Sequence, residues 1–348
     1  MLVMDAPRHA ARAPRRQIAP PPGVDSAALA DGVLRGDRAP LARAITLVES
    51  NSPLHRPAAR EVLRAVASRT GHAMRIGISG VPGAGKSTFI ESFGNHLCDL
   101  GHRVAVLAVD PSSSLSGGSI LGDKTRMETL SRRPECFIRP SPSGGALGGV
   151  ARKTRETISL CEAAGYDVVL IETVGVGQSE ITVRSMVDCI ILLLIAGAGD
   201  ELQGMKKGIL EIADIFVVNK ADGGNRARAE ATRAEFARIV PLLNSQATGW
   251  RPPVLSISAI EHRGISDLWD VTSRFFEHLR EDGRLDALRR AQTLHWWREL
   301  VEQELHHRFV SNPAIAEFSR RLENEVLSGR TPPSLAAEEL LDRFLPRL

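Results

Sequence analysis

The sequence predicts an α/β fold built on a doubly wound, mainly parallel sheet, with helical regions before and after it. Seven short apolar runs alternate with helical patterns between residues 75 and 280. Several of these runs are continuous Val, Ile and Leu, which is typical of strands buried on both faces of a parallel sheet. A Gly-rich segment joins the first run to a helical pattern at residues 80–87, as in nucleotide-binding sheets of this class.

The composition allows a sizeable core and excludes some partners. The chain has 348 residues, of which 43% are hydrophobic and 24% charged, and its formal net charge is +3. It contains no long block of like charges, so nothing indicates nucleic acid as a partner. No apolar stretch approaches the roughly 18 residues that a membrane-spanning helix requires, so no membrane association is expected.

The four cysteines indicate a reducing compartment. They are far apart in the chain and form no CxxC pair. We therefore expect buried free thiols, with disulfides or metal ligands as the alternative. The residues are Cys98, Cys136, Cys161 and Cys189.

Residues 1–24 are predicted to be a disordered leader. Residues 1–22 are rich in Ala, Pro and Arg, and Asp5 is their only acid. This composition is also typical of an organellar transit peptide, but the Pro-rich run Ala19–Pro22 opposes an amphipathic helix. We expect a bacterial cytoplasmic protein, with the mitochondrial matrix as the alternative.

Residues 25–72 are predicted to form an N-terminal helical region. Asp25 can cap the first helix with its carboxylate. The three expected helices are Ser26–Arg35, Ala39–Glu49 and Arg56–Ser68.

The α/β domain is expected at residues 73–282. The expected strands are Arg75–Ser79, Arg103–Val109, Cys136–Arg139, Asp167–Ile171, Asp188–Ile195, Ile215–Val218 and Val254–Ile257.

Residues 283–348 have only helical patterns, at Leu285–Phe309, Pro313–Ser328 and Ser334–Phe344. The first of these helices carries apolar side chains at helical spacing. This stripe can pack on the same chain or form a dimer surface, and the pattern alone leaves both open. Its members are Leu294, Trp296, Trp297, Leu300, Val301 and Leu305.

Residues Gly80–Ser87 match the phosphate-loop pattern GxxxxGK[ST], between a predicted strand and a predicted helix. Small residues let the backbone wrap around phosphates, and the helix N-terminus favours negative charge. Lys86 can reach the β- and γ-phosphates, and Ser87 can bind Mg²⁺. The remaining phosphate-binding residues are predicted to be Gly80, Val81, Pro82, Gly83, Ala84, Gly85 and Thr88.

An acidic residue follows the fourth expected strand. Glu172 begins the sequence Glu-Thr-Val-Gly175, in the position of a Walker B and switch II element. Glutamate is one methylene longer than the usual aspartate. We therefore expect Glu172 to contact Mg²⁺ through water or to contact a switch residue, with a capping acid as the alternative.

A second motif selects the base. The strand Ile215–Val218 ends in Asn219-Lys220-Ala-Asp222. Asp222 can accept hydrogen bonds from N1–H and the 2-amino group of guanine, whereas adenine would leave this carboxylate unpaired. Lys220 can cover the base with its stem. The backbone N–H groups of Ser258, Ala259 and Ile260, after the last strand, are candidates for guanine O6.

Four long strings, together with these motifs, make the chain similar to the MeaB/ArgK family of P-loop GTPases. They are AVDPSSSLSGGSILGDKTRM (108–127), FIRPSPSGGALGG (137–149), ETVGVGQSE (172–180) and GAGDELQGMKKG (197–208). The resemblance implies a GTPase domain with helical flanks, a C-terminal dimerisation arm and a homodimer.

The resemblance also implies switch residues. Asp110 and Asp123 would belong to switch I and the Mg²⁺ site, although Asp123 beside Lys124 could equally be a surface ion pair. Residues Gly197–Gly208 would form a further switch III. In it, Lys206 would stabilise charge on the transferring phosphoryl group, with a solvent-exposed lysine as the alternative. The expected catalytic residues are thus Lys86, Asp110, Glu172 and Lys206, and the expected metal ligands are Ser87, Asp110, Asp123 and Glu172.

The position of Gln178 predicts a slow enzyme. It follows Gly175 by three residues, not by one as in Ras-like GTPases, so it cannot be assumed to orient the attacking water. The resemblance implies that GTP binding and hydrolysis gate the loading of adenosylcobalamin on an acyl-CoA mutase, methylmalonyl-CoA mutase by default, and protect that enzyme. The cofactor would be carried by the mutase, and an adenosyltransferase could be a further partner.

Two alternatives remain, a kinase from a different functional class and a GTPase of the same broader class. A P-loop kinase of a transport system would transfer phosphate to a protein. A nickel-insertion GTPase would carry His-rich or Cys/His clusters, whereas His306-His307 is the only adjacent histidine pair in this sequence.

Overall fold

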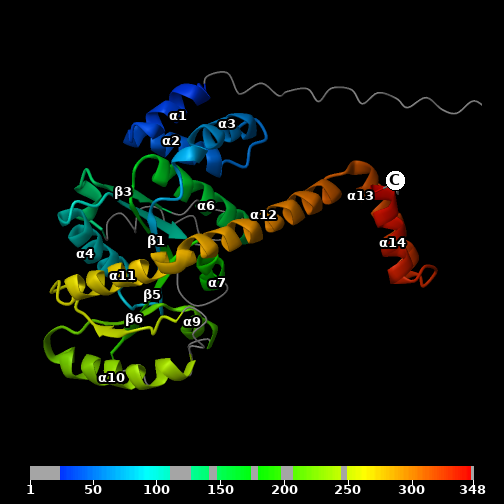
Figure 1. Ribbon diagram of the computed structural model, residues 1–348. Coiled ribbons are helices and arrows are strands. Elements are labelled where there is room, and N and C mark those ends of the chain that lie inside the picture. Colours follow the sequence, from blue (N-terminus) through cyan, green and yellow to red (C-terminus); the bar gives the residue numbers. More distant parts are fainter. Residues whose placement is uncertain are drawn as a thin grey trace, which may run out of the picture. The chain divides into compact units, whose positions relative to one another are not determined.

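The computed structural model describes residues 24–109, 127–140, 147–173, 179–196, 207–243 and 249–345. The chain divides into two compact units, Met1–Glu281 and Asp282–Leu348. Each unit is described by itself (Figure 1).

The larger unit is built on a seven-stranded parallel sheet with the order β3-β2-β4-β1-β5-β6-β7. The predicted fold class is confirmed, and each of the seven strands lies within two residues of its expected bounds. The strands are β1 Met74–Gly80, β2 Val104–Val109, β3 Cys136–Arg139, β4 Val168–Thr173, β5 Cys189–Ile195, β6 Ile215–Asn219 and β7 Val254–Ser256.

The register of the central strands brings three predicted site segments to one edge of the sheet. Ile78 of β1 pairs with Glu172 of β4, and Gly80 pairs with Leu193 of β5. Ile195 at the end of β5 pairs with Asn219 at the end of β6. The carboxyl ends of parallel strands meet at the same edge, which is where open α/β sheets bind ligands.

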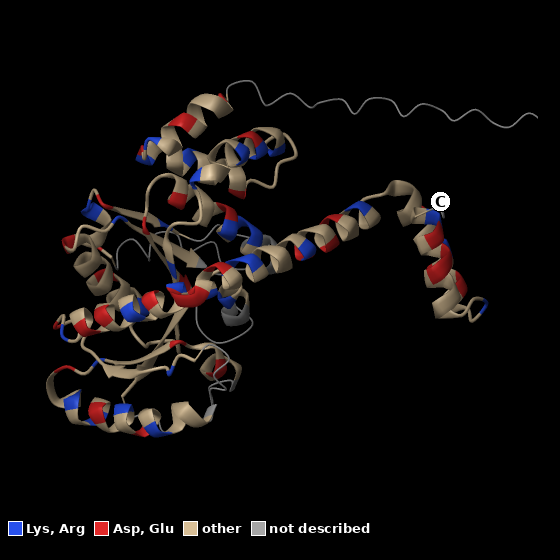
Figure 2. Ribbon diagram, viewed as in Figure 1, with Lys and Arg blue, Asp and Glu red and all other residues tan. Residues whose placement is uncertain are grey.

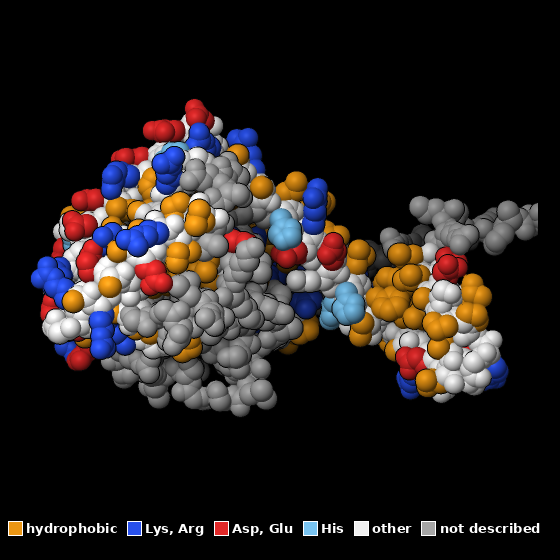
Figure 3. Space-filling model, turned by 90° about the horizontal axis from the view of Figure 1, so that it is seen from below, with side chains coloured by type: hydrophobic (Ala, Val, Ile, Leu, Met, Phe, Trp, Pro, Cys, Tyr) orange, Lys and Arg blue, Asp and Glu red, His pale blue; other side chains and the backbone are white. Residues whose placement is uncertain are grey.

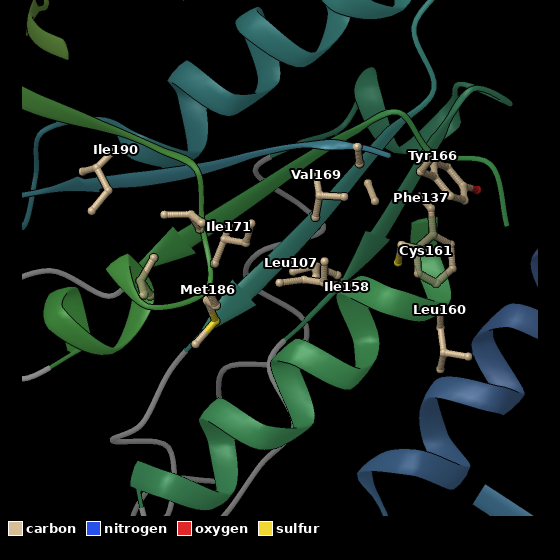
Figure 4. Close-up of a cluster of buried hydrophobic side chains, with 14 of the residues drawn as sticks. Leu107, Phe137, Ile158, Leu160, Cys161, Tyr166, Val169, Ile171, Met186 and Ile190 are labelled. Carbon is tan, nitrogen blue, oxygen red and sulfur yellow. The ribbon is translucent and has the colours of Figure 1, made fainter. Parts of the chain in front are cut away.

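Helices pack against the sheet and against one another. A buried cluster joins one face of the sheet to α6, α7, α9 and α10. Figure 4 shows part of this cluster, including Leu107, Ile158 and Met186. The helix α4 packs on β1, β2 and β4, and α11 packs on α4. These helices are α4 Lys86–Asp99, α6 Leu147–Ala163, α7 Ser179–Arg184, α9 Lys207–Ile212, α10 Arg226–Leu243 and α11 Ile265–Arg280.

The N-terminal helices share the core of the α/β domain. Their apolar residues Val33, Leu41, Ile45 and Val62 belong to the same buried cluster as the sheet, so these helices are not a separate unit. The carboxylate of Asp25 caps α1 by accepting from the amide of Ala28 at 2.9 Å, as predicted. The bounds are α1 Ser26–Leu34, α2 Arg38–Glu49 and α3 Arg56–Val66, and a short 3₁₀ turn follows at Ala67–Arg69.

The C-terminal unit consists of α12 Arg284–Val310, α13 Pro313–Leu327 and α14 Pro333–Phe344. The rings of Phe309 and Phe344 pack at 5.1 Å and join α12 to α14. Basic and acidic side chains are interspersed along α10, α11 and α12 (Figure 2). None of the helices in the described ranges is both long and apolar enough to cross a membrane.

Hydrophobic side chains gather on the surface of the C-terminal unit (Figure 3). Four members of the predicted stripe of α12 are between 41% and 59% exposed, namely Leu294, Trp297, Val301 and Leu305. Packing within the C-terminal unit therefore does not bury them.

Candidate nucleotide site

The phosphate loop connects β1 to the N-terminus of α4. β1 ends at Gly80 and α4 begins at Lys86. Gly80 has a φ of 151°, and a Cβ atom there would lie 2.5 Å from the carbonyl oxygen of Leu193. Gly83 and Gly85 have φ values of 82° and 83°. Glycine permits these conformations, so the loop can turn sharply and present backbone N–H groups beside a helix N-terminus.

Lys86 holds its ammonium group over this loop. Its Nζ donates to the carbonyl oxygen of Gly80 at 3.0 Å and to that of Val81 at 3.3 Å. The side chain is half-buried, so its charge is partly shielded from water. A cation in this position can bind phosphate oxygens that enter the loop.

Two of the four residues predicted to bind Mg²⁺, Ser87 and Glu172, are hydrogen-bonded to each other. The hydroxyl of Ser87, in the first turn of α4, donates to Oε1 of Glu172 at 3.0 Å. Glu172 is only 8% exposed. The neighbouring Thr173 donates to Oγ of Ser79 at 3.0 Å and so ties the end of β4 to β1. Hydroxyl and carboxylate oxygens are the ligands that Mg²⁺ prefers, so these side chains fit the ion.

Asn219 links the phosphate loop to the base-recognition side of the site. Its Nδ2 donates to the carbonyl oxygen of Ala84 at 2.9 Å, and its Oδ1 accepts from the amide of Ala259 at 3.3 Å. A Cβ atom on Gly85 would lie 3.0 Å from Nδ2 of Asn219 and 3.7 Å from Cε of Lys220. The stem of Lys220 therefore passes beside the loop, as expected for a side chain that covers the base.

Asp222 is oriented by a hydroxyl. Its carboxylate is half-buried, and Oδ1 accepts from Oγ of Ser258 at 3.2 Å. The other carboxylate oxygen and the remaining lone pairs can accept the two adjacent N–H groups of guanine.

One of the three candidate donors to guanine O6 already has a hydrogen-bond partner within the chain. The amide of Ser258 donates to the carbonyl oxygen of Arg263 at 3.0 Å and closes an antiparallel bridge. It is therefore not available to O6. The amide of Ala259 is also engaged, at 3.3 Å, by Asn219. Ile260 follows in the same turn with an exposed side chain, and its amide stays a prediction.

Comparison with known proteins identifies the family. Residues 41–314 match the model of the methylmalonyl-CoA mutase-associated GTPase MeaB. The chain belongs to the MeaB family of GTPases. The resemblance inferred from the sequence is thus confirmed, and the chain is a GTP hydrolase with the P-loop fold.

Several relatives cover nearly the whole chain. A probable GTPase of Mycobacterium tuberculosis is 53% identical over 90% of this chain and 94% of its own length. The GTPase ArgK of Escherichia coli is 47% identical over 88% of this chain and 95% of its own length. The mitochondrial methylmalonic aciduria type A homolog of Mus musculus is 47% identical over 91% of this chain and 79% of its own length.

A crystal structure titled LAO/AO transport system kinase has the same fold. The relative is 38% identical to this MeaB-family chain, with a TM-score of 0.73. The match covers 92% of this chain and 98% of the relative.

Three predicted switch residues, and the glutamine whose spacing predicts slow hydrolysis, lie outside the described residues. They are Asp110, Asp123, Gln178 and Lys206. The strands that lead toward them are described: β2 ends at Val109, directly before Asp110, and β4 ends at Thr173. Val109 pairs with Thr173 in the sheet, so both segments begin at the edge that holds Ser87 and Glu172.

The thiols are buried, as the cysteine spacing indicated. All four cysteines are free and buried. Burial raises the pKa of Cys98 to about 11 and that of Cys189 well above its ordinary value. Such thiols are protonated and unreactive at neutral pH.

Sequence reasoning missed an ion pair between α7 and the start of β6. Nη1 of Arg184 lies 2.6 Å from Oδ2 of Asp214, which also accepts from the amide of Ile190 at 2.8 Å. Burial raises the pKa of Asp214 to about 6, and the charge of Arg184 opposes this shift. An acid at the start of an apolar strand was the available signal, because an acid in a core needs a partner.

Proposed function

We propose that this MeaB-family GTPase is a nucleotide-switched chaperone of an adenosylcobalamin-dependent acyl-CoA mutase, with methylmalonyl-CoA mutase as the expected client. GTP binding and hydrolysis would gate the loading of adenosylcobalamin and protect or reactivate the mutase. The family description and the name of the mouse relative support this client.

The observation that carries the switch is the contact between Ser87 and Glu172 at 3.0 Å. It joins the phosphate helix to the strand end from which residues 174–178 continue. A group that enters between these oxygens and the loop would separate or reorient them. Nucleotide state would thereby reach the segment after β4 directly.

The chain's own residues divide the work in this mechanism. Lys86 binds phosphate oxygens, while Ser87 and Glu172, with Asp110 and Asp123, would hold Mg²⁺. Bound there, Mg²⁺ would supply positive charge that offsets the negative charge of the phosphates. Lys206 would add positive charge at the transferring group. Because Gln178 is displaced from the usual position, we expect slow intrinsic hydrolysis that a partner accelerates.

The proposed assembly is a homodimer in the bacterial cytoplasm, with the mitochondrial matrix as the minor alternative. Buried free thiols support a reducing compartment. Adenosylcobalamin would stay with the mutase, and an adenosyltransferase could join the exchange.

The chaperone proposal is tested by capture of the client. The tagged chain, loaded with a non-hydrolysable GTP analogue, is mixed with a lysate of the source cells and then with purified methylmalonyl-CoA mutase. We expect it to retain the mutase, and we expect the purified mutase to accelerate phosphate release from GTP. The Lys86→Ala variant, which should not bind nucleotide, is the matched control. If no cobalamin-dependent enzyme binds, the chaperone role is wrong while GTPase activity stands.

The solved relative is named a transport system kinase, so a second test distinguishes GTP hydrolysis from phosphate transfer to a protein. GTP labelled at the γ-phosphate distinguishes the two reactions, because a GTPase releases the label into water and a kinase leaves it on a protein. We expect free labelled phosphate alone.

A further inference from the structure

The turn that follows β7 holds the guanine motif through side chains that belong to no recognised nucleotide motif. Arg263 donates from Nη2 to the carbonyl oxygen of Ala221. Its Nη1 lies 3.2 Å from Oε2 of Glu261, and Oε1 of Glu261 accepts from the amide of Gly223 at 3.3 Å. Ala221 and Gly223 are the residues on either side of Asp222. Arg263 and Glu261 therefore hydrogen-bond to the backbone on both sides of the acid that is predicted to select the base.

The same turn also fixes the carboxylate itself. Ser258 and Arg263 exchange two backbone hydrogen bonds, at 3.0 and 3.1 Å. The hydroxyl of Ser258 accepts from the amide of Glu261 at 3.1 Å and donates to Asp222 at 3.2 Å. Backbone and carboxylate of Asp222 are therefore held by one turn, and a shift of that turn moves both.

His262 anchors this turn to the phosphate helix. Its φ is 53°, in the left-handed region, where histidine occurs more often than most other non-glycine residues. Its Nδ1 lies 2.7 Å from Oγ of Ser92, a buried residue of α4. Since α4 begins at Lys86, the turn connects the base side of the site to the phosphate side.

We propose that Glu261 and Arg263 are positioning residues that set the preference of the site for guanine by holding Asp222. The inference rests on the assignment of Asp222 to guanine, and it does not depend on the mutase partner. Inosine nucleotides distinguish this role, because hypoxanthine keeps N1–H and O6 but lacks the 2-amino group. A correctly aimed carboxylate binds GDP more tightly than IDP, and a displaced one loses that difference.

A matched surface pair is available as a control. Arg233 and Glu230 of α10 form an ion pair at 2.6 Å, with side chains 35% and 56% exposed. Arg263 and Glu261 are 37% and 44% exposed. The two pairs are similar in type and exposure, but only the second contacts the backbone around Asp222.

The experiment measures the dissociation constants of GDP and IDP by calorimetry. The variants are Arg263→Gln, Arg263→Lys, Glu261→Gln and Arg233→Gln, each with and without Asp222→Asn. We expect Arg263→Gln to reduce the preference for GDP about tenfold, since misplacing a polar partner costs on the order of one hydrogen bond. Arg263→Lys and Glu261→Gln keep part of the hydrogen bonding to the backbone around Asp222. They should therefore reduce the preference for GDP less. Arg233→Gln should leave it unchanged.

The effect of Arg263→Gln in the Asp222→Asn background decides whether Arg263 positions Asp222 or only stabilises the fold. In the Asp222→Asn background we expect Arg263→Gln to have no further effect on the ratio of the two constants. An unchanged ratio in Arg263→Gln, or an equal loss in both backgrounds, would overturn the proposal. If Arg263→Gln does not fold, the same comparison is made with Arg263→Lys and Glu261→Gln. If Asp222→Asn alone leaves the ratio unchanged, the assignment of guanine recognition to Asp222 is wrong instead.

Discussion

At the scale of single residues, two glycines of the phosphate loop share a positive φ but differ in their surroundings. A Cβ atom on Gly80 would lie 2.5 Å from the carbonyl oxygen of Leu193, whereas one on Gly83 would meet nothing within 4 Å. We expect Gly80→Ala to destabilise the protein by about 2–4 kcal/mol, since backbone must move. Gly83→Ala should cost only the conformational strain, about 1–2 kcal/mol. Equilibrium unfolding in urea measures both, and equal losses would contradict the steric argument.

Lys86 allows a prediction on binding. Its ammonium bonds two loop carbonyl oxygens in the described structure, at 3.0 and 3.3 Å. The Lys86→Ala variant should bind GTP and GDP at least about 100-fold more weakly, because charge-assisted contacts to phosphate are lost. Arg238→Ala, which removes an exposed positive charge on α10, is the control and should leave the affinity unchanged. Wild-type affinity in Lys86→Ala would refute the assignment of the phosphate loop.

The sequence predicts the site residues that belong to short contiguous motifs. It misses residues that contact the site from a different loop. Lys86, Ser87 and Asp222 are found because their motifs follow predicted strands. Local spacing also does not reveal that the amide of Ser258, a candidate donor to O6, bonds the carbonyl oxygen of Arg263 across an antiparallel bridge. Nothing in local spacing indicates that Arg263 would also reach Ala221.

At the scale of elements, the strands are predictable because most of them, including β4, β5 and β6, are buried on both faces. The expected Cys136–Arg139 is found with the same bounds, and the others shift by one or two residues at an end. Sheet order is not visible in such runs, since every strand has the same apolar character. The order becomes evident only from the pairing of β1 with both β4 and β5.

The connection between α7 and β6 permits a pH prediction. The pKa of Asp214 is raised from 3.8 to about 6 by burial. The folded state therefore binds the proton more tightly than the unfolded state, and this residue's contribution to stability falls as pH rises from about 4 to 6. Wild type should lose about 2 kcal/mol relative to Asp214→Asn between pH 4.5 and 7.

Urea unfolding of both proteins at the two pH values measures this difference, and the other carboxylates cancel in the comparison. Asp270→Asn is the control, because Asp270 is exposed on α11. A difference between wild type and Asp214→Asn that does not depend on pH would show that Asp214 titrates normally.

At the scale of the whole molecule, the two units differ in how completely they bury apolar residues. The larger unit has one extended core to which the N-terminal helices contribute. This shared core was not predictable from the sequence. The composition of helices α1–α3 does not indicate whether they pack against the sheet or form a core of their own. The smaller unit has few buried side chains among its described residues, including Leu285, Ile315, Leu322 and Ala336. So small a core gives little stability by itself.

The exposed stripe of α12 therefore carries the last prediction. Leu294, Trp297, Val301 and Leu305 recur at intervals of three and four residues, so they share one face of the helix. Against a second copy, burial of this face would stabilise a dimer by about 25 cal/mol for each Å² removed from water. We expect the wild type to sediment as a dimer and Trp297→Glu with Val301→Glu to sediment as a monomer, because two charges would be buried unpaired.

Gln303→Glu is the matched control for this prediction. Gln303 is exposed and lies on the opposite face of the same helix turn, so an added charge there should leave the dimer intact. The monomeric variant should still bind GDP, since the contacts of Lys86 and Asp222 lie within the larger unit. A dimer that survives the double substitution would mean that the subunits associate through another surface. Loss of GDP binding in a folded monomer would mean that the nucleotide site itself needs the second copy.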